Sequence, residues 1–193
     1  MSTPVRSDAI KRRALLLEAA AEVFAEQGLG CPTLKIARLA GVAEGTLFNY
    51  FSSKDVLLNE LYLHIKAELR DVMMPGYPRT ETVKKRARHA WQSYVDWGVA
   101  EPRKRKVVAL LGMSAQVTEQ SKLLGMQDFC EVNEMMQESI ASGLFRDQPA
   151  AFVSAIMGAL ADTTIDFIRR EPDQAERYAE AGFQAFWSAT AKE

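Results

Sequence analysis

The sequence has 193 residues, enough for one large domain or two smaller ones with a buried core. Apolar residues make up 48% and charged residues 25%, an ordinary globular composition. The net charge of −1 gives no support to binding of nucleic acid or membrane through overall charge. The basic residues are unevenly placed, however. Residues 1–54 contain seven against five acidic ones and the remainder 17 against 20, which is the asymmetry expected of an N-terminal DNA-binding module.

The two cysteines, Cys31 and Cys130, lie far apart and outside any CxxC pattern, which argues against a disulfide scaffold or a zinc finger. His64 and His89 have no partners at metal-ligand spacing, so we expect neither a metal site nor a cofactor. The N-terminal residues lack the apolar core of a signal peptide, and no stretch reaches the ~18 uninterrupted apolar residues of a membrane helix. These features predict a cytoplasmic protein.

Helical periodicity dominates the first third of the chain. RALLLEAAAEVFAEQG (13–28) has one broad apolar face and a second face with Glu18, Glu22 and Glu26, and Gly28 is typical of a helix end. TLKIARLA follows with Thr33 as the expected N-cap, and a second short helix is expected over about 44–50. A long helix over about 54–73 should begin at the S-x-x-D pattern of residues 52–55.

MPGYPR (74–79) is the clearest break in the sequence, and only helices are expected beyond it. The fold class predicted is therefore all-α. We expect an N-terminal helix-turn-helix domain over 1–54 and a C-terminal helical bundle over 55–193, the two joined by the long helix. The helices expected after the break cover about 80–100, 103–113, 117–142, 149–170 and 174–191.

A tight turn between two short helices needs small or apolar residues where the helices touch and a glycine where the backbone turns. Gly41 and Val42 suit the turn, and the inner faces are supplied by Ile36, Ala37, Ala40, Leu47 and Tyr50. The pattern predicts a helix-turn-helix motif that enters a DNA groove. A helical hairpin without a DNA role is the alternative.

LLEAAAEVFAEQG and TLKIARLAGVAEGTLFNYFSSKDVLL resemble the N-terminal signature of the TetR family of transcriptional regulators over about residues 12–58. The resemblance implies a homodimer with a three-helix DNA-binding domain and a helical domain that binds ligand and forms the dimer. It also implies a repressor that a small molecule releases from a palindromic operator. Ligand-binding or structural function with a DNA-binding module that no longer reads sequence remains the alternative. An enzyme is the least supported reading, since no catalytic arrangement is visible.

The second short helix would be the recognition helix, which enters the major groove by its N-terminal residues. Thr33, Tyr50 and Lys54 match positions that touch the phosphate backbone in the family, although Tyr50 could be core and Lys54 a solvated charge. The exposed candidates for base or backbone contact are Glu44, Gly45, Thr46, Phe48 and Asn49.

Two departures from the family pattern affect this helix. Ala43 offers no N-cap oxygen. Glu44 either favours the positive end of the helix or accepts a hydrogen bond from a cytosine amino group. Attraction to DNA must then come from cations outside the recognition helix, namely Arg6, Lys11, Arg12, Arg13, Lys35 and Arg38.

Large or pliable side chains in the C-terminal part are compatible with a cavity for a lipophilic effector, although each could be ordinary core. The candidate ligand-binding residues are Trp91, Tyr94, Trp97, Met113, Phe129, Asn133 and Met136.

The last two helices carry apolar residues around most of their circumference, which predicts a twofold four-helix interface between two copies. One-sided packing within a monomer is the alternative. The basic clusters at 84–88 and 103–106 are expected to be solvated faces. The candidate interface residues are Phe152, Ile156, Ala159, Phe167, Phe183, Phe186 and Trp187.

Overall fold

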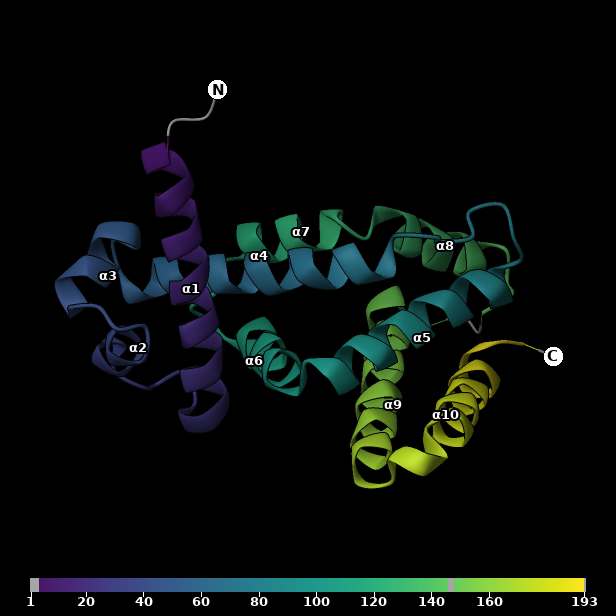
Figure 1. The fold of residues 1–193 in the computed structure, drawn as a ribbon. Helices are drawn as coiled ribbons and strands as arrows, with labels where there is room; N and C mark the ends of the chain where they lie inside the picture. The colour runs from purple at the N-terminus through teal and green to yellow at the C-terminus, as the bar shows by residue number, and fades with distance from the viewer. Residues whose placement is uncertain (1–3, 146–147, 193) are drawn as a thin grey trace. The chain divides into compact units, whose positions relative to one another are not determined.

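The computed structural model describes the backbone of residues 4–145 and 148–192, and the side chains of residues 8–145 and 148–192. Within these ranges the regular structure is helical, and the one pairing of extended backbone is an isolated bridge between Phe145 and Ala191 (Figure 1). The predicted all-α fold class is confirmed. The elements are α1 Pro4–Gln27, α2 Thr33–Leu39, α3 Glu44–Tyr50, α4 Lys54–Met73, α5 Val83–Ala100, α6 Pro102–Met113, α7 Glu119–Gln127, α8 Cys130–Ala141, α9 Ala150–Arg170, η1 Pro172–Gln174 and α10 Ala175–Thr190.

The chain forms two compact units. Unit 1 consists of Met1–Glu68 and Pro102–Met126, and unit 2 of Leu69–Glu101 and Gln127–Glu193. Helix α4 passes from one unit to the other, and α6 and most of α7 belong to the same unit as the N-terminal helices. The boundary predicted at residues 54 and 55 is not the boundary between these units. It therefore stays a prediction about which residues bind DNA and which bind ligand and partner.

In unit 1, α1, α2 and α3 pack together at the N-terminal end of α4 (Figure 1). The predicted apolar face of α1 is confirmed, because Leu16, Ala20 and Phe24 have no exposed surface. The same core receives buried side chains from the other three helices, namely Ile36, Ala37, Leu47, Leu57, Leu58 and Leu61. Burial of such side chains contributes about 1.5–3 kcal/mol each, so this core fixes the three-helix arrangement.

The residue before the first turn differs from the predicted cap by one position in two helices. Thr33 is the first residue of α2 and not its cap, because Pro32 occupies the cap position with extended backbone. Helix α4 is capped by Ser53 and not by Ser52, since Ser53 Oγ accepts a hydrogen bond from the backbone N–H of Val56 at 3.2 Å. In both cases the residue before the helix, Pro32 or Ser53, is the cap residue that flanks the first helical turn.

The single helix predicted over 117–142 is wrong. The helix is interrupted at Asp128 and Phe129, between α7 and α8. The backbone of Phe129 has φ −116° and ψ 25°. The Phe129 side chain at this interruption is buried, with 5% of its surface exposed. Unit 1 ends at Met126 and unit 2 resumes at Gln127, so the break also lies beside a unit boundary.

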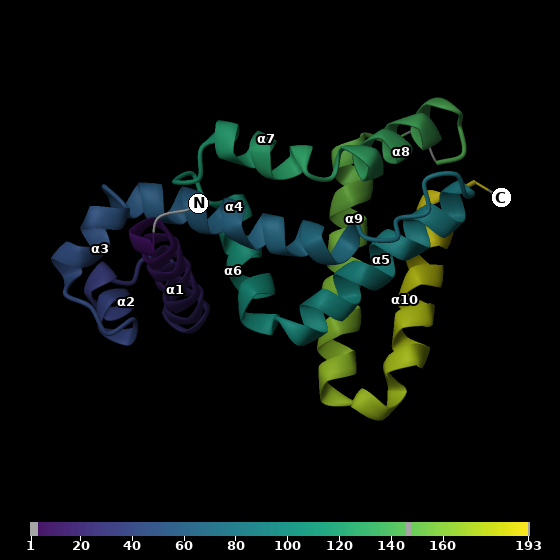
Figure 2. The same ribbon diagram turned by 45° about the horizontal axis from the view of Figure 1, so that its top comes forward.

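Unit 2 is built on close contacts among α5, α9 and α10, and Figure 2 shows α9 and α10 side by side and antiparallel across the η1 turn. Trp91 of α5 is fully buried, stacks on Phe186 at 6.1 Å between ring centroids, and donates its indole N–H to Ala179 O at 3.1 Å. A Cβ on Gly182 of α10 would overlap Thr164 Oγ1 and lie 2.7 Å from the Trp91 ring. The absence of a side chain at residue 182 is therefore a condition of this packing.

Helix α9 is long and apolar enough to cross a membrane by length and composition alone, with a window of mean hydropathy 1.5. Only 28% of that window is buried within this chain. Phe152 and Phe167 on this helix are 53% and 41% exposed. The chain by itself therefore leaves much of an apolar helix uncovered.

Candidate nucleic-acid interface

The turn between α2 and α3 is closed by backbone hydrogen bonds around Gly41. The N–H of Gly41 donates to Arg38 O at 3.1 Å and the N–H of Val42 donates to Ala37 O at 2.9 Å, the pair of bonds that makes a Schellman ending. Gly41 has φ +69°, a left-handed conformation that favours glycine, as the sequence predicted. Val42 is half-buried at the corner. These contacts fix the direction in which α3 leaves the turn.

Helix α3 has a buried side and an exposed side. Leu47 has no exposed surface and holds the helix on the core. Gly45, Phe48 and Asn49 are exposed, while Thr46 is half-exposed. Phe48 is 41% exposed, a large apolar side chain left in solvent. The residues predicted to face DNA thus lie on the side of α3 that the protein leaves open. Tyr50 is half-buried, so both readings of it remain.

Glu44, in the first turn of α3, is bound by the neighbouring helix. Thr33 Oγ1 donates to Glu44 Oε1 at 2.7 Å, and Thr33 is 8% exposed. The cap position of α3 is Ala43 and makes no side-chain hydrogen bond, as the sequence predicted. The Glu44 carboxylate therefore links the beginnings of α2 and α3.

Lys54 is anchored inside unit 1 and is not a freely solvated charge. Its Nζ donates to Cys31 O at 2.8 Å and lies 5.8 Å from the centre of the Phe24 ring. An ammonium group has three donors, so two remain for a phosphate. Lys35 is exposed and its Nζ donates to Gln27 Oε1. Both cations are thus held on the helix-turn-helix surface with capacity for a further contact.

The other N-terminal cations differ in availability. Lys11, Arg12 and Arg38 are exposed. Arg13 forms an ion pair with Glu60 and lies 5.1 Å from the Phe51 ring centre. The side chain of Arg6 lies outside the described residues. The positive charge available to DNA therefore comes mainly from residues that the structure leaves exposed on α1 and α2.

The basic cluster at 103–106 is not simply a solvated face. Arg103 on α6 pairs with Glu22 at 3.1 Å and with Glu26 at 3.5 Å. Lys104 pairs with Glu18 at 2.9 Å and with Glu68 at 2.8 Å. The acidic face of α1, which the sequence identified without a partner, is thus paired with the first turn of α6.

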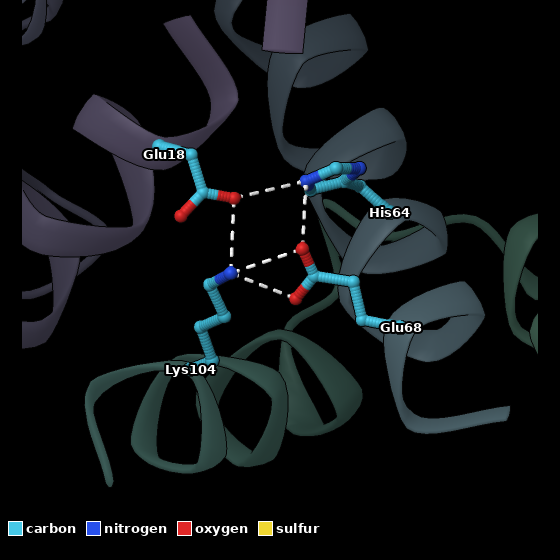
Figure 3. Close-up of polar contacts among 4 residues, drawn as sticks. All are labelled: Glu18, His64, Glu68 and Lys104. Carbon is cyan, nitrogen blue, oxygen red and sulfur yellow. Dashed lines mark hydrogen bonds and ion pairs between the residues drawn. The ribbon is translucent and has the colours of Figure 1, made fainter. Parts of the chain in front are cut away.

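Glu18, His64, Glu68 and Lys104 form a four-residue cluster (Figure 3). His64 Nε2 lies 3.1 Å from Glu18 Oε1 and 3.3 Å from Glu68 Oε1. The ligand atoms of the three residues other than lysine lie within 4.8 Å of one another, a proximity that sequence spacing missed. Lys104 Nζ bonds both carboxylates (Figure 3), so the ammonium is their cation in this structure.

Burial and pairing oppose each other in this cluster. Partial burial alone would raise the pKa of Glu18, but hydrogen bonds from Lys104 and His64 together lower it below its ordinary value. Partial burial would lower the pKa of Lys104, but hydrogen bonds to Glu68 and Glu18 raise it above its ordinary value. Both groups are therefore stabilised in their charged forms.

The predicted ligand residues do not share one environment. Met113 is 80% exposed and belongs to unit 1, so the structure places it on a surface and not in a core or a cavity with the others. In unit 2, Trp91, Trp97, Phe129 and Met136 are buried. Tyr94 and Asn133 are half-buried. Trp97 differs from Trp91 in that its indole N–H has no hydrogen-bond partner within the described part of the chain.

A groove of about 490 Å³ lies between α5, the end of α9 and the start of α10, and the predicted ligand residues do not line it. Its rim carries the carboxylates of Asp96, Glu176 and Glu180. Arg88 donates to Glu180 and lowers the pKa of that carboxyl to about 2, while Gln92 donates to Asp96 at 2.8 Å. The groove thus combines an apolar lining, which includes Val99 and Ile168, with three carboxylates.

The predicted dimer residues divide into three groups by exposure. Phe183 and Phe186 are 0% and 1% exposed and pack against Trp91, so their side chains serve the core of this chain. Ile156 and Trp187 are half-buried. The exposed members are Phe152, Ala159 and Phe167, all on α9.

Residues 16–61 match the family described as "Bacterial regulatory proteins, tetR family". The chain is 33% identical over 79 residues to the uncharacterized HTH-type transcriptional regulator YhgD of Bacillus subtilis, a match that covers 38% of this chain and 41% of that protein. It is 27% identical over 179 residues to the HTH-type transcriptional repressor KstR2 of Mycolicibacterium smegmatis, covering 85% of this chain and 81% of the repressor.

Among solved structures, a protein of Shewanella sp. PV-4 assigned to the tetR family of transcription regulators superposes with a TM-score of 0.82 and 28% identity. That match covers 94% of this chain and 99% of the Shewanella chain. The family match runs from the middle of α1, through α2 and α3, into the first part of α4, and the structural match covers most of the chain. Residues 16–61 therefore match the TetR family of transcriptional regulators, and the chain as a whole is similar in fold to a solved structure assigned to that family.

Proposed function

We propose that this protein is a homodimeric transcriptional repressor that binds a palindromic DNA operator and is released by a small, lipophilic effector. The proposal assigns binding and no catalysis to the chain, requires no metal or cofactor, and places the protein in the cytoplasm. The observation that carries it is the open side of α3, where Gly45, Phe48 and Asn49 are exposed opposite the buried Leu47.

DNA recognition would use α3 in the major groove. Asn49 would bond adenine or a phosphate, Thr46 would meet a phosphate or a thymine methyl group, and Phe48 would contact a thymine methyl group. Gly45 would let the backbone approach DNA closely. Lys35 and Lys54, with Tyr50, would contact phosphates on either side of α3.

Dimerisation would cover the exposed face of α9. The helix carries exposed Phe152, Ala159 and Phe167 on a segment that is mostly unburied within one chain. A twofold contact between α9 and α10 of two copies would bury this surface and place two α3 helices on two half-sites of a palindrome.

The effector would bind among the large side chains of unit 2. Trp91, Trp97 and Phe129 supply buried aromatic surface there, and Met136 adds an adaptable thioether. The unpartnered N–H of Trp97 is a donor that a polar atom of the effector could satisfy. Tyr94 and Asn133 would complete the polar contacts.

The test is a selection of random DNA duplexes by the purified full-length protein, followed by sequencing of the bound pool. We expect enrichment of one palindromic motif whose half-sites are about one helical turn apart. Asn49→Ala should change the preferred base at one position in each half-site, whereas Gln120→Ala, which removes an exposed amide on α7, should leave the motif unchanged. If the protein binds DNA but enriches no motif, its DNA-binding module does not recognise a specific sequence, and the repressor proposal is refuted.

A further inference from the structure

The two short helices of the helix-turn-helix motif both begin without a side-chain cap. Pro32 precedes α2 and Ala43 precedes α3, and neither makes a side-chain hydrogen bond to its helix. A capping oxygen ordinarily stabilises such a start by about 1 kcal/mol. Short helices without caps depend on other contacts for a fixed orientation.

One side-chain contact joins these two beginnings. Thr33 is the first residue of α2 and Glu44 the first residue of α3, and Thr33 Oγ1 donates to Glu44 Oε1 at 2.7 Å. Thr33 is 8% exposed and Glu44 is half-exposed, so the bond is partly shielded from water. A threonine hydroxyl has a single proton to donate. In this structure that proton is used inside the protein.

We propose that Glu44 is a positioning residue for the recognition helix and not a base-reading residue. By accepting the Thr33 hydroxyl, its carboxylate fixes the rotation of α3 on α2 and therefore the directions in which Thr46 and Asn49 project. Thr33 acts through Glu44 and not as a phosphate contact. This inference rests on the proposed DNA-binding function, and it explains how a carboxylate is tolerated at the end of a helix that approaches DNA.

The contact predicts a particular pattern of loss. Without it, α3 keeps Leu47 as its anchor but samples more orientations, so the contacts that depend on direction weaken. Binding to DNA of unrelated sequence depends chiefly on charge, and removing a carboxylate cannot weaken that attraction. The ratio of specific to non-specific affinity should therefore fall, whereas a general loss of folded protein would lower both affinities together.

The experiment compares Glu44→Ala, Thr33→Val and their double variant on the duplex enriched by the wild-type protein and on a scrambled duplex. Each single variant should bind the enriched duplex about tenfold more weakly, as expected for one hydrogen bond to a charged group. The scrambled duplex should be bound at least as well as by the wild type. The double variant should be no worse than the weaker single variant.

Two conservative variants serve as controls. Thr33→Ser keeps the hydroxyl and Glu44→Gln keeps an acceptor oxygen, so both should restore most of the specific affinity. Because Thr33→Val could disturb α2, the folded fraction of every variant is measured by helical circular dichroism and by titration of binding-competent protein. Thr33→Ser remains informative if Thr33→Val does not fold.

Three results would overturn the inference. A new base preference at one operator position in Glu44→Ala, without one in Thr33→Val, would make Glu44 a base reader. Additive losses in the double variant would show that Thr33 and Glu44 act separately. A uniform loss on both duplexes would reduce the contact to general stability. Failure of the wild-type protein to enrich any sequence would instead refute the proposed function itself, before the variants are compared.

Discussion

At the scale of single residues, Gly45 is a position where a glycine is not required by packing within the protein. A Cβ built on Gly45 would meet no atom within 4 Å, and the residue lies within α3. Glycine in a helix is less favourable than alanine by about 1 kcal/mol. Packing within the chain therefore gives no reason for glycine at this position, whereas the proposed close approach of the α3 backbone to DNA would give one.

Gly45→Ala should raise the free energy of unfolding by about 0.5–1 kcal/mol and weaken operator binding. The first effect is measured by urea denaturation and the second by titration with the selected duplex. Gly112→Ala is the matched control, because Gly112 is an exposed glycine in α6 whose Cβ would also meet no atom within 4 Å. It should stabilise the protein without changing DNA affinity. Unaltered operator binding by Gly45→Ala would remove Gly45 from the interface.

At the scale of elements, the most unexpected contact is the one between α1 and α6. Glu18, Glu22 and Glu26 lie on one face of α1 and each pairs with a cation from the first turn of α6. Exposed ion pairs contribute about 0–1 kcal/mol each because water and salt screen them. Lys104 differs from Arg103, since its side chain is 12% exposed and bonds two carboxylates.

Lys104→Met should lower the free energy of unfolding at pH 7.5 by about 1 kcal/mol. The expected loss is this small because Glu18 is partly exposed and water screens its ion pair with Lys104. The pKa of Glu18 is lower in the folded protein than its ordinary 4.5, so its stabilising effect is present above that pH and is lost as the pH falls below it. The deficit of the variant should therefore shrink as the pH falls below 4.5. Urea denaturation at a series of pH values measures it.

The control for this comparison is Lys106→Met, which removes an exposed cation of α6 that makes no ion pair with a described residue. It should leave stability within about 0.5 kcal/mol of the wild type. A deficit in Lys104→Met that stays constant as the pH falls would show that lost packing of the lysine side chain, and not charge pairing, causes it.

The elements also show which features a sequence can predict. Helical periodicity, Gly28 and Gly41 predicted the N-terminal helices well, because each signal is local to a few residues. The break at Phe129 coincides with burial of that side chain, and burial is not a local property of the sequence. The partners of Arg103 and Lys104 depend on contacts with α1, which lies more than 70 positions away in the chain. Periodicity shows that a face is polar but does not identify the element it meets.

The candidate interface follows the same division. The exposed side of α3 was predictable from the position of Leu47 and the turn, and the resemblance supplied the positions that we propose contact phosphate. The contact between Thr33 and Glu44 was not predictable, because it depends on the angle between two helices. The burial of Phe183 and Phe186 also escaped prediction, since an apolar residue looks the same in a sequence whether it faces a partner or its own core.

At the scale of the whole molecule, the exposed surface of α9 is the feature that a single chain leaves unexplained. The helix is long and apolar enough to span a membrane. However, the same fold is found in a solved structure assigned to the tetR family of transcription regulators, which matches 94% of this chain. An apolar helix that is mostly uncovered in one chain is the surface that a second copy would bury.

Phe152→Glu and Phe167→Glu should each prevent the proposed dimer from forming, because burying two like-charged carboxylates at an apolar twofold contact is unfavourable. Light scattering after size-exclusion chromatography measures the mass, and binding to the palindromic duplex should fall by about a hundredfold or more as one half-site is lost. Leu123→Glu on α7, where Leu123 is 66% exposed, is the control and should remain dimeric. Dimers of both α9 variants, or wild-type protein found in the membrane fraction, would contradict the assignment.

The close approach at Gly182 bears on that same pair of helices. With Thr164 and Trp91 occupying the space where a Cβ would lie, α10 is held against α9 and α5 at a distance that even one methyl group would increase. Any partner that recognises α9 and α10 together recognises their spacing as well as their side chains. That spacing is set by Gly182, which contributes no side chain to the surface that a partner would contact.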